Sequence, residues 1–209
     1  EGVVVVVTSN RPPSDLYKDG LQRALFLPFI GLIEEKLDLL MLDGPTDYRR
    51  ETIQKVGVYL TPNDKEADRA LGQLFERLTS DAEGLSDPII VYGRELNLPL
   101  AADGVALSGF KDLCGATLGP ADYLAIAERY HTLIMYGIPK LGPECRNEAK
   151  RFVTLIDALY ENSVNLICSA DAPPSELYVE GDGAFEFERT ASRLIEMQSE
   201  EYLGKAHAA

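Results

Sequence analysis

The sequence predicts an α/β protein in which a parallel sheet carries helices and continues into antiparallel strands. Residues 3–7 are five consecutive valines, and so short an apolar run is typical of a strand buried on both faces of a parallel sheet. Residues 132–136, 147–161 and 164–168 form a strand–helix–strand pattern, which is the connection that parallel strands need. Between residues 87 and 110 apolar and polar residues alternate around turn signals, which predicts two or three antiparallel strands.

The first 45 residues are expected to hold one strand–turn–helix segment and one further strand. After the valines, residues 10–13 form a turn, and residues 14–36 follow a helical spacing with Ser14 as the N-cap. Pro28 should divide this stretch into two helices. Residues 37–42 are a second short apolar run, which predicts a strand ending at Asp43 and Gly44.

The remaining elements are predicted from periodicity and turn chemistry. Residues 64–80 should form an amphipathic helix, because one face gathers the apolar side chains Ala67, Leu71, Leu74, Phe75 and Leu78. The antiparallel strands should turn at Gly93-Arg94 and at Asp103-Gly104. Residues 120–130 begin with a proline, which the first turn of a helix tolerates. A last helix is expected over residues 190–202.

Composition restricts the classes of partner and site. The 209 residues carry a formal charge of −14, which argues against a nucleic-acid partner bound through the whole surface. No apolar stretch approaches the roughly 18 to 20 residues that span a bilayer. Cys114, Cys145 and Cys168 are an odd number without a C-x-x-C pair, so we expect structural thiols in a reducing compartment rather than disulfides or a zinc site.

Two segments far apart in the chain repeat one another. Residues 3–20 align without gaps on residues 164–181, and both contain a Pro-Pro-Ser-acid-Leu-Tyr string after an apolar run. The first copy ends its strand in Ser9-Asn10-Arg11, where the second has Ala170-Asp171-Ala172. Ligands of open α/β sheets lie at the carboxyl ends of strands. An amide and a guanidinium there suit a phosphate, whereas a carboxylate repels it, so the first copy is the predicted ligand side.

Long strings of this sequence resemble the ZapE-type cell-division ATPases. The resemblance rests on "TSNRPPSDLYKDGLQRALFLPFI", "LDGPTDYRR", "FKDLCGATLGPADYLAIA", "NEAKRFVTLIDALYENSVNLICSA" and "FEFERTASRLIEMQSEEYL". This family consists of AAA+-class P-loop proteins with mitochondrial relatives. The resemblance implies that residues 1–45 are the last part of an AAA+-like nucleotide-binding core, and that residues 46–209 form a C-terminal α/β region with antiparallel strands.

The same resemblance implies that nucleotide is held mainly outside this sequence. Family members carry a Walker A loop and a Walker B Asp-Glu upstream of the "TSNRPP" string, and neither motif occurs here. The Gly204-Lys205 pair is followed by Ala206 rather than by Ser or Thr. We therefore expect the sequence to be the C-terminal part of a protein that binds ATP and Mg²⁺, and to be inactive alone.

By resemblance, two residues of the first copy have catalytic roles. Asn10 matches the sensor-1 position, where a polar side chain orients the attacking water or contacts the γ-phosphate. Arg23 falls where AAA+ proteins place the arginine finger, at the end of the helix after sensor 1, and would act on the nucleotide of a neighbouring subunit. The alternatives are a turn-capping role for Asn10 and a solvent-exposed position for Arg23.

The sensor-2 arginine, which would bind nucleotide from a helix, has several candidates. Three arginines fit that description: Arg151, Arg189 and Arg193. The alternative for each is an ion pair at helical spacing with a nearby acid, namely Glu148, Glu188 or Glu196.

The resemblance implies ATP hydrolysis coupled to protein remodelling in bacterial cell division. It implies an oligomer joined across the arginine-finger interface, a division-ring protein as partner, and a cytoplasmic location compatible with peripheral association at the inner membrane, or a mitochondrial one in a eukaryote. The alternative from another class is a non-catalytic protein-interaction module. A third reading, an enzyme with a Cys–His nucleophile, is weak because no cysteine has the base spacing that this chemistry requires.

Overall fold

The computed structural model describes residues 6, 7, 9, 12–16, 23–40, 53, 57–79, 84–181 and 183–204. The chain divides into two compact units, Glu1–Pro45 and Thr46–Ala209, which are treated separately below. The assignment of the first unit to a nucleotide-binding core stays a prediction.

The first unit contains a short 3₁₀ helix, η1 (Pro13–Asp15), and a 14-residue helix, α1 (Arg23–Lys36). Helix α1 runs through Pro28, so the predicted division into two helices is wrong. Proline removes one backbone donor, but its fixed φ near −65° already lies in the helical range, and the helix continues on both sides.

The strands predicted in this unit are not found in its described residues. Val6 and Val7 lie outside any strand and are 86% and 71% exposed, while residues 3–5 lie outside the described part. Residues 37–40 likewise form no strand, and Leu40 is 87% exposed. An apolar run becomes a strand only when another strand pairs with it, and no strand pairs with either run in the described part of this unit.

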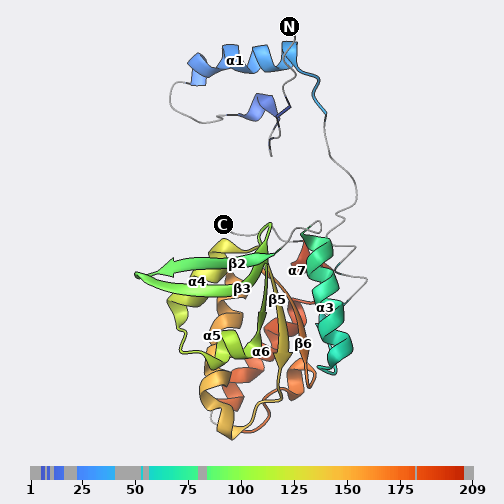
Figure 1. Cartoon of the computed structure of the whole chain (residues 1–209), viewed down its shortest axis with the longest axis vertical. Coiled ribbons are helices and arrows are strands. Elements are labelled where there is room, and N and C mark those ends of the chain that lie inside the picture. Colours follow the sequence, from blue (N-terminus) through green and yellow to red (C-terminus); the bar gives the residue numbers. More distant parts are fainter. Residues whose placement is uncertain are drawn as a thin grey trace. The chain divides into compact units, whose positions relative to one another are not determined.

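The second unit is built on one six-stranded sheet, which confirms the α/β class (Figure 1). The strand order is β1-β6-β5-β4-β3-β2. Strands β4, β5, β6 and β1 are parallel neighbours, and β2, β3 and β4 are antiparallel. The strands are β1 (Tyr59–Leu60), β2 (Leu85–Val91), β3 (Arg94–Ala102), β4 (Val105–Gly109), β5 (Thr132–Ile138) and β6 (Asn165–Ala170).

Two-residue turns join the antiparallel strands. Asp103 and Gly104 have φ of 49° and 74°, and Tyr92 and Gly93 have φ of 49° and 77°, as type I′ turns require. The first turn therefore starts one residue earlier than predicted. Pro99 lies inside β3, next to the point where the β2–β3 register shifts, which is where a sheet accommodates a residue without an N–H.

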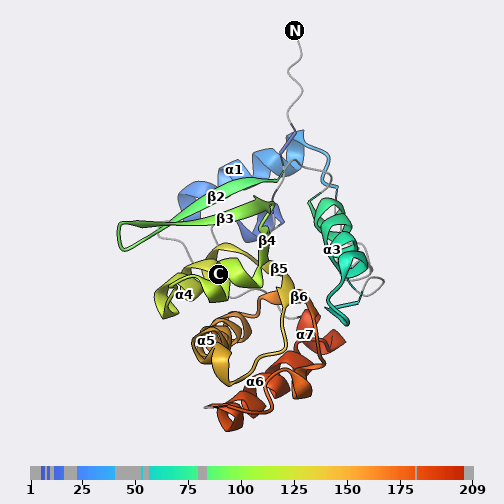
Figure 2. The same cartoon turned by 60° about the horizontal axis from the view of Figure 1, so that its bottom comes forward.

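Helices cover both faces of the sheet (Figures 1 and 2). Helix α3 contacts β4, β5 and β6 on one face, and α4, α5 and α6 form the other layer. These helices are α3 (Lys65–Leu78), α4 (Pro120–Arg129), α5 (Arg146–Glu161), α6 (Ala184–Glu196) and α7 (Glu200–Leu203). Among the described residues, no helix combines the length and the apolar character that crossing a bilayer demands.

Helix α3 confirms the predicted amphipathic pattern. Asp64 is its N-cap, and one carboxylate oxygen accepts hydrogen bonds from the backbone N–H groups of Glu66 and Ala67, each at 2.9 Å. The buried face is the predicted one: Ala67, Leu71, Leu74, Phe75 and Leu78. These side chains pack on Val105, Ile134 and Ile167 of the sheet.

The predicted last helix, residues 190–202, is wrong in its extent. Helix α6 begins earlier, at Ala184, after Gly183 with a φ of 95°. It ends at Glu196, and a new N-cap follows at Ser199, whose hydroxyl accepts the N–H of Tyr202 and starts α7. A capping serine inside a periodic stretch therefore divides it into two helices.

The two copies of the repeat share the turn around their Pro-Pro-Ser string. Helix η1 corresponds to η4 (Pro174–Glu176), and Pro12 and Pro173 have nearly equal dihedrals, −62°/154° and −59°/158°. In each copy the N–H three residues after this proline donates to its carbonyl at 2.9 Å. Outside this turn the copies differ: Val6 and Val7 lie outside any strand, whereas their counterparts in the second copy belong to β6. Leu16 has a ψ of 135°, and Leu177 has a ψ of −38°. The repeat of conformation is thus limited to the turn.

Candidate functional site

Arg23 is the first residue in the described part of α1. Its assignment as an arginine finger stays a prediction. Its Nη2 donates to the carbonyl oxygen of Ser14 at 2.6 Å, which links α1 to η1. Its Nε is buried without a hydrogen-bond partner. No carboxylate among the described residues pairs with this guanidinium. Asn10 and Arg11 lie outside the described residues, so the geometry between Asn10 and Arg23 stays a prediction.

Arg151 of α5 supports the segment that follows β4. Its Nη1 donates to the carbonyl oxygen of Cys114 at 2.9 Å, and the hydroxyl of Tyr123 donates to that of Leu113, also at 2.9 Å. Both carbonyls belong to a short π-helix, Lys111–Gly115, whose terminal carbonyls lack partners within the helix. The contacts of Arg151 are those of a residue that stabilises a helix terminus.

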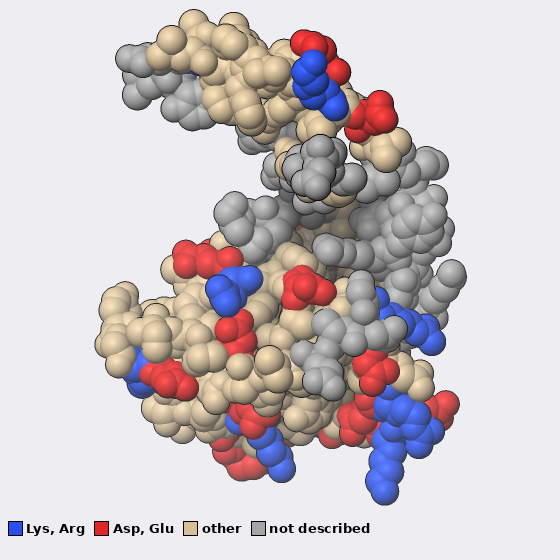
Figure 3. Space-filling view, turned by 45° about the horizontal axis from the view of Figure 1, so that its top comes forward, with Lys and Arg blue, Asp and Glu red and all other residues tan. Residues whose placement is uncertain are grey.

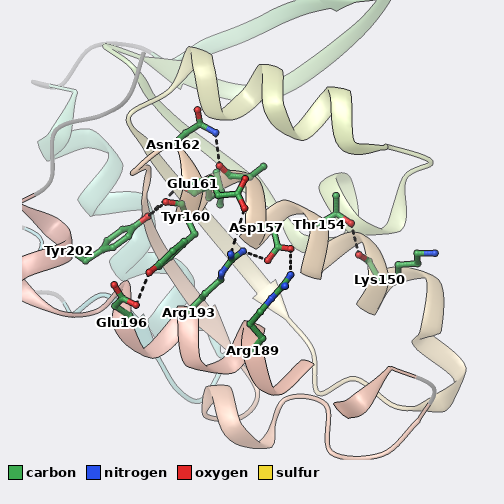
Figure 4. Close-up of polar contacts among 12 residues, drawn as sticks. Lys150, Thr154, Asp157, Tyr160, Glu161, Asn162, Arg189, Arg193, Glu196 and Tyr202 are labelled. Atoms are coloured by element: carbon green, nitrogen blue, oxygen red, sulfur yellow. Dashed lines mark hydrogen bonds and ion pairs between the residues drawn. The ribbon is translucent and has the colours of Figure 1, made fainter. Parts of the chain in front are cut away.

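Arg189 and Arg193 of α6 meet at one carboxylate of α5 (Figure 4). Arg189 Nη2 lies 2.6 Å from Asp157 Oδ2, and Arg193 Nη1 contacts Asp157 Oδ1. Arg193 Nη2 also lies 3.6 Å from Glu161 Oε1. The acids expected for these arginines were neighbours on the same helix, whereas the acids that pair with them belong to α5.

The two arginines differ in environment. The side chain of Arg193 is 18% exposed, against 65% for Arg189. The face of the Arg193 guanidinium lies on Tyr160, 4.7 Å from the ring centroid, and the Tyr160 hydroxyl donates to Glu196 at 2.7 Å (Figure 4). That hydrogen bond is the main cause of the raised pKa of Tyr160. The guanidinium of Arg193 thus joins α6 to α5, because its nitrogen atoms contact carboxylates and its flat face lies on an aromatic ring. Arg151 instead binds the π-helix that follows β4.

The carboxyl ends of β1 and β6 form the point of the sheet where ligands are expected. The chain leaves β1 for α3 on one face and leaves β6 for α6 on the other, and such reversals create crevices in open α/β sheets. Ser169 Oγ accepts the N–H of Gly137 at 3.1 Å and donates to Asn63 Oδ1 at 3.0 Å. Asp171, the counterpart of Asn10, donates its N–H to Ile138 at this edge.

This edge does not suit a polyphosphate. The first amides of α3 are already bound by Asp64, so they are not available to an anion. Asp171 adds an exposed carboxylate. Burial is the main cause of the raised pKa of Tyr136, and Asp112 and Asp68 add to it, which marks further negative charge near this edge. Sequence reasoning missed Asn63 and Ser169, because their contact depends on the order of the strands.

The cysteines and His131 show no arrangement for nucleophilic catalysis. Cys114 and Cys168 are buried, and burial raises the pKa of both thiols. A thiol needs a lowered pKa to react as a nucleophile. The ring nitrogens of His131 contact Thr132 Oγ1 at 2.9 Å and the Asp103 carbonyl at 3.0 Å. In the part of the chain that is described, His, Cys, Asp and Glu form no group of three that could hold a metal ion.

Comparison with known proteins identifies relatives over the whole chain. The chain is 38% identical over 213 residues to "Cell division protein ZapE" of Escherichia coli, an alignment covering 100% of this chain and 56% of that protein. It is 36% identical to "Lactation elevated protein 1 homolog B" of Danio rerio, covering 96% and 47%. It is 43% identical over 179 residues to "Uncharacterized protein C115.02c" of Schizosaccharomyces pombe, covering 85% and 39%.

The chain spans about half the length of these curated relatives. No solved structure matches it in the same comparison. The family model described as "AFG1-like ATPase" matches residues 1–206. The chain therefore belongs to the AFG1-like ATPase family.

Proposed function

We propose that this chain supplies the sensor and arginine-finger residues of an ATPase that remodels a protein partner during cell division. Membership of an ATPase family supports the reaction, and the ZapE relative, a cell division protein, supports the process. In this proposal Asn10 orients the attacking water in its own subunit. Arg23 reaches the γ-phosphate of ATP bound, with Mg²⁺, by the next subunit of an oligomer.

The observation that carries the proposal is that Arg23 has no carboxylate partner among the described residues. Arg189 and Arg193 are held by Asp157, so their charge is already compensated. Arg23 instead makes one hydrogen bond, to a backbone carbonyl, and leaves Nε unsatisfied. An arginine finger needs this condition, because its charge must be available to the negative charge that develops on the transferred phosphoryl group.

The partner in this proposal is a protein of the division apparatus, on the cytoplasmic side of the membrane. On the face seen in Figure 3, Lys and Arg lie next to Asp and Glu, and the described residues form no continuous basic tract. A nucleic-acid partner would favour such a tract. The nucleotide itself would be held mainly by residues other than those of the second unit, whose acidic sheet edge is described above.

The proposal is tested by ATP turnover of the full-length protein. Asn10→Ala and Arg23→Ala should each lower kcat, the latter by roughly a hundredfold or more, since arginine fingers are worth 10³–10⁵ in GTPases. Arg23→Lys should restore little, because an ammonium does not reproduce the planar guanidinium. Arg77→Ala, which replaces an exposed arginine in the last turn of α3, is the matched control and should leave kcat unchanged.

If Asn10→Ala and Arg23→Ala both hydrolyse ATP as fast as the wild-type protein, the roles proposed for the two residues are wrong. The competing function, a protein-interaction module without catalysis, predicts no ATP turnover in the wild-type protein. The acidic edge around Asp171 is the observation that favours it. Assaying the wild-type protein first separates the two functions.

A further inference from the structure

The side chain of Arg23 is held by the backbone of the turn that contains η1. Its Nη2 donates to the carbonyl oxygen of Ser14 at 2.6 Å, a short distance that fits a charged donor. The two residues lie nine positions apart, so this hydrogen bond closes a loop between the turn and α1. Among the described residues, no second acceptor binds this guanidinium. One end of it is therefore fixed, and its charge is not compensated by the group that fixes it.

The turn that carries this carbonyl has little conformational freedom. Pro12 and Pro13 restrict φ, and Pro12 has φ and ψ of −62° and 154°. The N–H of Asp15 donates to the Pro12 carbonyl at 2.9 Å, and the N–H of Leu16 donates to the Pro13 carbonyl at 3.1 Å. No described backbone N–H donates to the carbonyl of Ser14, which leaves it to the arginine. Two prolines and two backbone hydrogen bonds thus set the direction of the acceptor.

The second copy of the repeat indicates that this turn does not need an arginine. Pro173 has nearly the same dihedrals as Pro12, and the N–H of Glu176 closes the turn on the Pro173 carbonyl at 2.9 Å. The first arginine after that turn is Arg189, which binds Asp157 of α5. Because the same turn forms without an arginine contact, the contact in the first copy does not maintain the turn. The turn instead provides a fixed acceptor for the arginine.

We propose that the Ser14 carbonyl, held by the two prolines, orients the guanidinium of Arg23 for the γ-phosphate of ATP bound by the next subunit. Ser14 is then a positioning residue, which acts only through Arg23, and its role rests on the function proposed for Arg23. Preorganised charge stabilises a transition state best, because no reorganisation is needed at the moment of reaction. A neutral carbonyl orients the guanidinium without cancelling its charge, as a carboxylate would.

The first test loosens the turn and leaves Arg23 in place. Pro12→Gly in the full-length protein should lower kcat by roughly tenfold or more with an unchanged KM for ATP, because the arginine is then misplaced only in the transition state. Pro173→Gly, an exposed proline of the same turn in the second copy, is the matched control. It should lower Tm as much as Pro12→Gly, since both relax the unfolded chain alike, and should leave kcat unchanged.

The second test asks in which subunit the loosened turn acts. Pro12→Gly chains are mixed with chains that cannot bind ATP but keep Pro12 and Arg23. The mixture should turn over ATP faster than its two components summed, because intact nucleotide sites then meet a well-oriented arginine. No such gain, while sedimentation shows mixed oligomers, would place the defect in the chain's own site, for instance at Asn10, and would overturn the positioning role.

The two proposals fail in different ways. A wild-type kcat in Pro12→Gly beside a lowered kcat in Arg23→Ala overturns the positioning role of Ser14 alone. A wild-type kcat in Arg23→Ala overturns the function proposed for Arg23, and the positioning role with it. A lowered kcat in Pro173→Gly would show that the effect of Pro12→Gly is one of general stability, which also contradicts positioning.

Discussion

The guanidinium of Arg193 lies against the ring of Tyr160, with its central carbon 4.7 Å from the ring centroid. This contact joins α6 to α5, and Asp157 and Glu161 bind the edges of the same guanidinium. Arg193, which was a sequence-based candidate for a nucleotide sensor, therefore contacts three side chains of α5 within the second unit.

Replacing Arg193 should destabilise the protein more than replacing Arg189. Arg193→Ala removes charge-assisted hydrogen bonds and a cation–π contact at a mostly buried site, and should lower the free energy of unfolding by about 2 kcal/mol. Arg189→Ala removes an exposed ion pair and should cost under about 1 kcal/mol. Urea unfolding of both variants gives the comparison.

Asp157→Ala should cost more than Arg189→Ala, because it leaves two arginines without their shared partner. A cycle with Arg193→Ala and Tyr160→Ala should show coupling, since the two side chains are in contact. Equal effects of the two arginine substitutions, together with additive behaviour in the cycle, would refute this description of the α5–α6 contact.

The free energy of unfolding should decrease as the pH rises above about 9. Burial raises the pKa of several phenols and thiols in the folded state: Tyr59, Tyr123, Tyr130, Tyr202, Cys114 and Cys168. Above pH values of about 9 to 10 the unfolded chain releases these protons and the folded chain keeps them, so the unfolded state binds fewer protons and stability declines as pH rises. Below that range the stability is fully present.

The variant Tyr123→Phe tests how much of the loss of stability at high pH comes from this buried phenol. This variant loses the hydrogen bond to Leu113, so its stability at pH 7 should fall by about 1 kcal/mol. Its stability should then decline less steeply than that of the wild type between pH 9 and 11. Unfolding curves at a series of pH values measure both effects, and an unchanged slope would contradict the role of this buried phenol.

Two glycines in equivalent turns should respond differently to alanine. Gly93 and Gly104 both have positive φ, so each substitution should cost about 1 kcal/mol in backbone strain. A Cβ at Gly93 meets nothing within 4 Å, whereas one at Gly104 would lie 2.7 Å from Cδ2 of His131. Gly104→Ala should therefore lower the Tm further than Gly93→Ala, and the reverse order would show that His131 moves aside at no cost.

Arg151 should stabilise the backbone hydrogen bonding of the segment that follows β4. Arg151→Ala leaves the Cys114 carbonyl without its donor, so amide hydrogen exchange should accelerate in the π-helix Lys111–Gly115 and the residues that follow. Lys150→Ala, an exposed neighbour on the same helix, should not change it. If Arg151→Ala instead preserves exchange and weakens nucleotide binding, Arg151 is the sensor-2 residue.

Local patterns predicted much of the second unit. The apolar face of α3, the β5–α5–β6 unit and the Asp103-Gly104 turn followed from periodicity and turn chemistry, and each is present. The two strand predictions in the first unit failed because strand formation depends on a pairing partner that is distant in the sequence. Leu40 and Val7 lie in apolar runs, but a strand needs a pairing partner that such runs do not specify.

The candidate site was harder to predict for the same reason. Helical spacing predicted that the arginines of α6 pair with Glu188 or Glu196, but only the packing of α5 against α6 brings Asp157 to them. Ser169 and Asn63 are far apart in the chain, so their hydrogen bond follows from strand order rather than from spacing. Arg23 was identified by resemblance, and its lack of a described carboxylate partner is a property of the three-dimensional structure.

Mixing two inactive variants of the full-length protein tests the proposed trans action of Arg23 most directly. One variant carries Arg23→Ala, and the other carries a substitution that abolishes ATP binding but keeps Arg23. The mixture should regain ATP turnover, because intact nucleotide sites then meet an intact Arg23 from a neighbouring subunit. A mixture that remains as inactive as its components, while sedimentation shows that mixed oligomers form, would contradict the account.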